Sequence, residues 1–269
     1  MSRRDDVPVA DRELSHRPQR SDESKITSSV LDIFRGQNAT GDLVSLETRY
    51  SEVPARPAVL SRGMFIPAPD AARSDEECWD FLATQAFGHL IAPGAGREFP
   101  VVVPTQYVVH ERSIVLHLAS PNPVWAALAE HPVAVLSVAG DWAYIPGQWK
   151  AIGDEDPGAG VPTTYYAAVQ AFCDVTIVDG PDLLGVLRTQ LAALEPALPD
   201  PQQHTSKLPG IRGLVLRPRE LRGKFKYGGN VDAEHRAAVA TRLTERSGPG
   251  DAAARTQLLR RQTRTVRGE

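Results

Sequence analysis

The chain has 269 residues, of which 42% are apolar and 23% are charged, so it can bury a sizeable core in one or two domains. A formal net charge of -3 excludes a basic, DNA-coating protein as a first interpretation. Because no apolar run reaches the ~18 residues of a membrane span and no secretory signal is visible, we expect a cytoplasmic protein with no membrane contact.

Residues 1–63 mix acidic and basic side chains with scattered prolines, a composition that is too polar to order itself. We therefore expect a flexible N-terminal extension. Met1 and Met64 are the only two methionines, and the compact pattern begins at Met64. This pattern favours Met64 as the true translation start, a hypothesis that peptides from before Met64 in the natural protein would exclude.

The first predicted element is a helix that follows Ser74. Ser74 and Glu77 form a capping box, and apolar residues then recur at helical spacing from Cys78 to Ala86. Four short runs rich in β-branched residues come next and are predicted strands, over residues 87–92, 101–109, 114–118 and 133–139. Between the last two runs, Asn122 is expected to cap a short helix that starts at Pro123.

The second half of the chain predicts a long strand followed by helices. Residues 166–178 alternate between apolar and polar side chains, and we expect the longest strand there. A helix follows Pro181, a proline-rich loop covers 196–209, and 211–216 form a strand. Asn230 is expected to cap a final helix over 231–246, which ends before an arginine-rich tail.

Strands outnumber helices in this pattern, and strand and helix do not alternate regularly. The sequence therefore predicts a mainly β (α+β) fold, a small and mostly antiparallel barrel with peripheral helices. No complete dinucleotide fingerprint, P-loop, nucleophile elbow or HExxH motif is present, which removes the usual support for Rossmann, hydrolase and zinc-enzyme interpretations. No catalytic residue or metal site is assigned.

The first cluster of candidate binding residues joins the end of a strand to a capped helix. It contains His117, Ser120 and Asn122 beside the free amides of the helix start, which suits a phosphate or a planar ligand. The alternative for His117 is a structural hydrogen bond.

Two further clusters lie later in the chain. The second, over 143–150 and 161–166, mixes aromatic rings that suit a planar ring system with hydroxyls and one cation, namely Trp149, Lys150, Thr163 and Thr164. Its alternative is packing at the barrel rim. The third, over 223–230, places Lys224 and Lys226 before a helix start, as a phosphate monoester requires, although lysines on a surface strand are usually only solvated.

Six segments taken in order resemble the PaiB-type FMN-binding negative transcriptional regulators, and the likeness covers roughly residues 64–246. They are 64–67 (MFIP), 87–90 (FGHL), 117–125 (HLASPNPVW), 143–145 (AYI), 161–163 (VPT) and 224–226 (KFK). The resemblance implies a split β-barrel of the flavin-reductase and pyridoxamine-phosphate-oxidase kind, a homodimer, and FMN held near the subunit interface.

On this resemblance we divide the chain into the extension (1–63), an FMN-binding split-barrel domain (64–230) and a C-terminal helix with a basic tail (231–269). Ser120 stands where many relatives have Arg, so the phosphate charge would have to come from Lys150, Lys224 or Lys226. The FMN-binding residues are then expected among the three clusters above.

Three functions are compatible with this sequence, and its motifs favour the first over the other two. The first is an FMN-binding regulator, whose DNA contact would rest on the arginine-rich end because no helix-turn-helix is visible. The second is a flavin-dependent oxidoreductase. The third is a haem enzyme, because His117 aligns with the axial ligand of haem b in the similar piperazate synthases. Whether the protein is an enzyme is left undecided.

Overall fold

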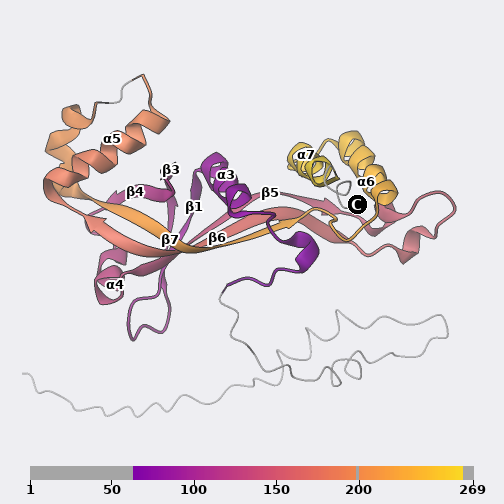
Figure 1. Ribbon diagram of the computed structural model, residues 1–269, viewed down its shortest axis with the longest axis horizontal. Coiled ribbons are helices and arrows are strands. Elements are labelled where there is room, and N and C mark those ends of the chain that lie inside the picture. Colours follow the sequence, from indigo (N-terminus) through magenta and orange to yellow (C-terminus); the bar gives the residue numbers. More distant parts are fainter. Residues whose placement is uncertain (1–62, 198–199, 263–269) are drawn as a thin grey trace, which may run out of the picture. The chain divides into compact units, whose positions relative to one another are not determined.

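The computed structural model describes residues 63–197 and 200–262 (Figure 1). The expected flexible extension, apart from Gly63, lies outside these residues, as does the end of the basic tail. In the described part, seven strands form one antiparallel sheet in the order β2-β1-β5-β6-β7-β4-β3, with helices around it. The predicted fold class is confirmed.

The strands are β1 (Phe87–Ala92), β2 (Val101–Gln106), β3 (Val108–His110), β4 (Ser113–Ala119), β5 (Val133–Ile145), β6 (Thr163–Val178) and β7 (Ile211–Lys226). The helices are α3 (Asp75–Gln85), α4 (Val124–Glu130), α5 (Leu183–Leu194), α6 (Ala233–Arg246) and α7 (Asp251–Gln262). Short 3-10 helices are η2 (Ala68–Asp70), η3 (Gly147–Lys150), η4 (Pro157–Ala159), η5 (Gly180–Asp182) and η6 (Pro201–Gly210). None of the helices in these described ranges is both long and apolar enough to cross a membrane.

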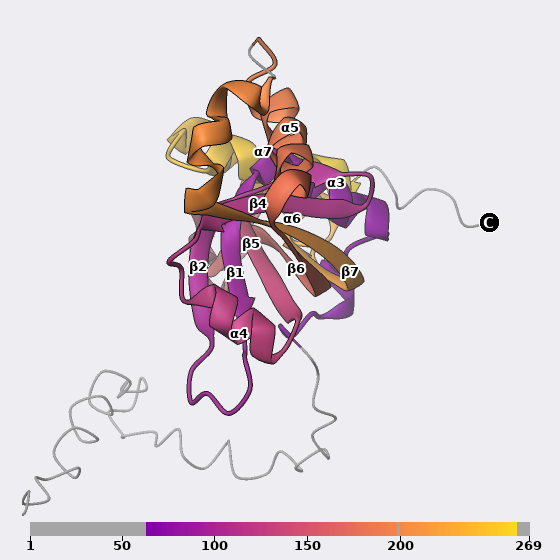
Figure 2. The ribbon, with the colours of Figure 1, turned by 90° about the vertical axis from the view of Figure 1, so that its left-hand side faces the viewer.

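The two edge strands of the sheet are consecutive in the sequence. β2 ends at Gln106 and β3 begins at Val108, so Tyr107 alone separates the strands at opposite edges of the sheet order. The sheet must curl until those edges meet, which makes it a barrel (Figure 2). The single strand expected over 101–109 is therefore two strands, because the chain changes its pairing partner from β1 to β4 at Tyr107.

Tyr107 also fixes this seam to the first helix. Its ring is fully buried, and its hydroxyl donates a 2.8 Å hydrogen bond to the Leu82 carbonyl in α3. The Ser74 side chain accepts from the Glu77 amide at 3.3 Å, which confirms the predicted start of α3. Cys78, Phe81 and Leu82 turn inward from α3, so the apolar stripe of this helix closes one side of the core.

β6 and β7 pair over almost their full length, with 16 residues each. The strand expected to be longest, 166–178, begins earlier at Thr163 and is matched in length by β7. The prediction for β7 stopped at Leu216 because charged residues and Pro218 follow. The structure accommodates Pro218 where the β6–β7 register shifts, between Phe172 and Cys173, as expected for proline at a bulge.

The C-terminal helices begin at places that differ from the sequence prediction. α6 is capped by Asp232, whose Oδ1 accepts from the amides of Glu234 and His235, and not by Asn230. Residues 251–262, expected within the basic tail, form α7. Ala254 and Leu258, one helical turn apart, are fully buried against the core, which explains why this arginine-rich segment is a docked helix.

Candidate cofactor site

A pocket of about 260 Å³ lies where η2, η3, the start of β6, the end of β7 and the segment between β7 and α6 meet. Three predicted binding residues line it, Lys150, Thr163 and Lys226. Its other lining residues are Pro67, Pro69, Asp70, Tyr165, Gly228, Asn230 and Val231. Because complete small-molecule pockets measure roughly 300–1,000 Å³, this one suits one end of a cofactor.

Lys150 and Lys226 give the pocket its positive charge. Neither ammonium group forms a hydrogen bond or an ion pair with any residue of 63–197 or 200–262. The pKa of Lys150 is lowered, first because partial burial disfavours its charged form and second because the charge of Lys226 repels it. Two cations that share a pocket, neither of them paired within the described residues, favour an anionic ligand.

Asp70 brings a carboxylate into the same wall. It is only 8% exposed, and its side chain accepts no hydrogen bond within the described ranges. Burial raises the pKa of Asp70, and the nearby charges of Lys224, Lys226 and Arg261 only partly offset this effect. Sequence analysis missed Asp70 because an acidic residue in a proline-containing stretch carries no recognisable motif.

Tyr165 and Thr163 add hydroxyl groups. Tyr165 is 2% exposed, and burial raises its pKa to about 12, so it remains a neutral phenol at physiological pH. Gly228 lies against this hydroxyl with a φ of 67°, a conformation that favours glycine. The pocket therefore combines cations with neutral hydrogen-bond donors, as a phosphate group requires.

The other predicted residues at this end of the barrel have structural partners. Trp149 is buried, with the Arg246 guanidinium 4.5 Å from its ring centroid. Lys224 donates to the Phe65 carbonyl at 3.1 Å. Thr164 is paired with Tyr144 across β5 and β6. These three residues lie on the same elements as Lys150, Thr163 and Lys226, but their side chains do not line the pocket.

The first cluster lies elsewhere, and each of its side chains has a partner. His117 Nδ1 lies 2.7 Å from Gln190 Oε1 in α5. Ser120 Oγ donates to the Pro209 carbonyl at 3.1 Å. Asn122 Oδ1 accepts from the Val124 amide at 3.0 Å, while the N-cap position of α4 is Pro123 and the helix begins at Val124, one residue later than predicted.

The two groups of predicted residues lie at opposite ends of β7. His117 is paired with Gly213 near the start of this strand, and Lys226 is its last residue. At about 3.3 Å per residue, the strand between them covers roughly 40 Å. Figure 1 shows the same separation, with α5 at one end of the β6–β7 pair and α6 and α7 toward the other. One mononucleotide bound to one chain cannot contact both groups.

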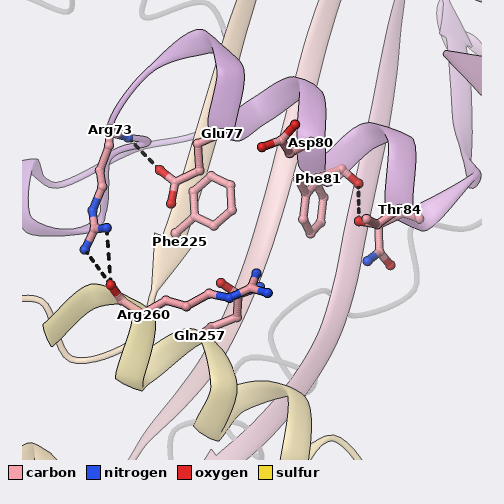
Figure 3. A pocket seen from close by; sticks show the side chains of 9 residues that line it. Arg73, Glu77, Asp80, Phe81, Thr84, Phe225, Gln257 and Arg260 are labelled. Carbon is pink, nitrogen blue, oxygen red and sulfur yellow. Dashed lines mark hydrogen bonds between the residues drawn. The ribbon is translucent and has the colours of Figure 1, made fainter. Parts of the chain in front are cut away.

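A second pocket, of about 360 Å³, lies between α3 and α7 (Figure 3). The Arg73 guanidinium donates to the Arg260 carbonyl at 3.3 Å, while the Arg73 amide donates to Glu77 Oε2 at 2.6 Å. Glu77 also pairs with Arg261. Because these groups hold α7 against α3, we treat this pocket as part of a helix contact rather than as the cofactor site.

Residues 64–217, more than half of the chain, match a family model described as "Putative FMN-binding domain". The chain belongs to this FMN-binding family. Over 196 residues it is 23% identical to "Protease synthase and sporulation protein PAI 2" of Bacillus subtilis (strain 168), a match that covers 69% of this chain and 92% of that protein. The resemblance drawn from the sequence is thereby confirmed.

Solved structures of similar proteins include an FAD and haem binding protein and a flavocytochrome. The FAD and haem binding protein of Mycobacterium smegmatis is 19% identical with a TM-score of 0.47, over 63% of this chain and 80% of that chain. The flavocytochrome Anf3 of Azotobacter vinelandii is 17% identical with a TM-score of 0.46, over 62% of this chain and 74% of that chain.

The family match ends within β7. Lys226, Gly228, Asn230 and Val231 therefore come from the segment that follows the matched residues, although they line the same pocket as Lys150 and Thr163. In this member of the FMN-binding family, the C-terminal segment is built into the candidate site.

Proposed function

We propose that this member of the FMN-binding family binds FMN and holds its phosphate in the pocket that Lys150 and Lys226 share. The observation that carries the proposal is the presence, beside the hydroxyls of Thr163 and Tyr165, of two lysines that form no hydrogen bond or ion pair within the described residues. Each charge-assisted hydrogen bond to a phosphate contributes roughly 1.5 to 3 kcal/mol, so two or three of them retain a nucleotide.

Bound FMN supplies electron and hydride transfer, and the chain supplies binding, orientation and charge. Lys150 and Lys226 place positive charge at one end of the cofactor, while Tyr165 remains a neutral donor because its pKa is about 12. The residues at this pocket fit a phosphate monoester, and we assign them no step in a reaction.

The decisive experiment is an absorption spectrum of the purified protein, followed by titration with FMN and riboflavin while flavin fluorescence is recorded. We expect a flavin spectrum and saturable binding, with FMN bound more tightly than riboflavin because only FMN carries the phosphate. A folded preparation that binds neither flavin would overturn the proposal. A Soret band that disappears in His117→Ala would replace FMN with haem.

We propose a PaiB-like regulatory role as the biological use of this flavin site, in the cytoplasm, where free thiols such as Cys78 and Cys173 persist. The expected DNA contact through the arginine-rich end is weakened by one finding. Arg261 is buried and donates to the Ala71 carbonyl and to Glu77. A mobility shift with the upstream region of its own gene at low salt tests direct contact, and no shift would reject it.

We also propose a homodimer in which each flavin contacts both chains. The separation of His117 from Lys226 along β7 supports this arrangement, because two chains can bring opposite ends of their barrels together. The exposed aromatic side chains Trp142 (63% exposed) and Tyr144 on β5 offer apolar surface for such a contact. Sedimentation of the protein and of Trp142→Glu tests it: we expect a dimer for the first and a monomer for the second.

A monomeric wild-type protein that still binds FMN would reject the shared site while leaving FMN binding itself intact.

A further inference from the structure

Arg236, on the side of α6 that faces the barrel, is a charged side chain in an unusual environment. It is only 8% exposed, and its Nε atom is buried without a hydrogen-bond partner in the described residues. A buried guanidinium whose donors lack acceptors is costly, so arginines in such positions normally pair with a carboxylate or a phosphate. The described part of the chain provides Arg236 with neither.

The position of Arg236 relates it to the cofactor pocket through Gly228. A β-carbon built on Gly228 would lie 2.5 Å from the Tyr165 hydroxyl and 3.6 Å from Arg236 Cγ. Gly228 and Tyr165 both line the pocket. The positive charge of Arg236 also partly offsets the effect of burial on the pKa of Tyr165. The Arg236 side chain therefore packs next to two residues that line the pocket, although Arg236 is not itself one of the lining residues.

We propose that Arg236 is the third cation of the phosphate site, where its guanidinium donates to phosphate oxygens together with Lys150 and Lys226. This inference rests on the proposed FMN binding and adds to it a residue of the C-terminal helix α6, which lies beyond the matched family domain. The planar guanidinium donates two parallel hydrogen bonds to a phosphate, which a lysine cannot do.

The charges around the pocket agree with this assignment. When Arg236 is counted with the two lining lysines, three cations outnumber Asp70, the one carboxylate among the lining residues, by two. A phosphate monoester carries a charge of about -1.5 to -2 at pH 7, which nearly balances that excess. Riboflavin carries no such group. The site therefore selects a flavin that ends in a phosphate monoester.

The test compares the affinities for FMN and for riboflavin in Arg236→Gln and in Arg242→Gln. Arg242 lies exposed on the same helix, so its substitution makes the same change in charge away from the pocket. We expect Arg236→Gln to weaken FMN binding by roughly 10- to 100-fold and to leave riboflavin binding unchanged. Arg242→Gln should change neither affinity.

Arg236→Lys keeps the positive charge, and we expect it to recover part of the lost FMN affinity. Thermal unfolding of each variant verifies folding. If Arg236→Gln does not fold, the comparison of FMN with riboflavin in Arg236→Lys decides the question, because a lysine loses the paired hydrogen bonds. An unchanged ratio of the two affinities in the folded variants would overturn the role of Arg236. A wild-type protein that binds no flavin would instead overturn the proposed function.

Discussion

Gly228 and Tyr165 approach each other so closely that only a glycine fits, since a β-carbon on Gly228 would lie 2.5 Å from the Tyr165 hydroxyl oxygen. The backbone there has a φ of 67°. This contact holds the segment that follows β7 against β6 in the wall of the candidate phosphate site. It connects a local backbone conformation with the shape of the pocket.

The first prediction concerns this contact. Gly228→Ala should destabilise the fold and weaken FMN binding, because the added methyl group displaces the Tyr165 hydroxyl. Gly96→Ala is the matched control, with the same φ of 67° but no atom within 4 Å of the added β-carbon. Both variants incur backbone strain, and Gly228→Ala should lose at least about 1 kcal/mol more in the free energy of unfolding. Equal losses in denaturant titrations would contradict the steric argument.

The second prediction concerns the pocket lysines. Lys150→Met and Lys226→Met should each weaken FMN binding about tenfold, because each removes one charge-assisted hydrogen bond. Lys207→Met, on an exposed side chain of η6, should have no effect. Because the pKa of Lys150 is lowered, its contribution should disappear as the pH rises through that lowered value. Fluorescence titrations at several pH values measure both effects. If Lys150→Met, Lys226→Met and Lys207→Met bound FMN with equal affinity, the phosphate would not lie in this pocket.

The third prediction concerns pH and the contacts of His235 with Asp232 and Glu155. His235 Nδ1 lies 2.7 Å from Asp232 and its Nε2 lies 2.9 Å from Glu155, so two carboxylates flank the ring. The hydrogen bond with Glu155, more than any other cause, raises the pKa of His235. The pKa values of Glu155 and Asp232 are lowered, mainly by backbone hydrogen bonds and also by His235.

The direction of the pH dependence follows from these pKa shifts. The stability contributed by His235 is fully present below its unfolded pKa of about 6.5 and is lost as the pH rises through the higher folded value. His235→Gln should therefore lower Tm at about pH 5.5 and have little effect at about pH 9. His131→Gln, on an exposed side chain, serves as the control. A loss of Tm that is the same at both pH values would show that the ion pairs contribute nothing.

The fourth prediction concerns the attachment of α7. The buried Asp251 carboxylate pairs with Arg246 and accepts from the Gly248 amide at 2.8 Å, while Arg246 lies over Trp149 next to Lys150. Asp251→Asn should cost roughly 3 kcal/mol in the free energy of unfolding, because it leaves Arg246 without its partner. Asp182→Asn, on an exposed side chain, should cost almost nothing.

The pairing of Asp251 with Arg246 also predicts an acid effect. The hydrogen bond from Arg246 is the main cause of the lowered pKa of Asp251. The stability from this pair is therefore present above the unfolded pKa of about 3.9 and is lost as the pH falls through the lower folded value. Urea titrations at acidic and neutral pH should show the difference between wild type and Asp251→Asn shrinking in acid.

The sequence determined those features that depend on nearby residues. The capping box at Ser74 placed the start of α3, and alternation of side chains found β6, because hydrogen-bond caps and apolar periodicity act within a few residues. The order of short motifs was enough to find the FMN-binding family. Lys150, Thr163 and Lys226 were selected by residue type and by their place in short clusters, and they do line one pocket.

The tertiary structure decided what depends on distant residues. The charged half of β7 became a strand because β6 supplies its hydrogen-bond partners, and the run over 101–109 broke at Tyr107 because the barrel must close there. The burial of Asp70 and Arg236 could not be predicted, since charged residues are normally exposed. Burial depends on packing between elements that are far apart in the chain. The same packing decides which charged side chains surround the site.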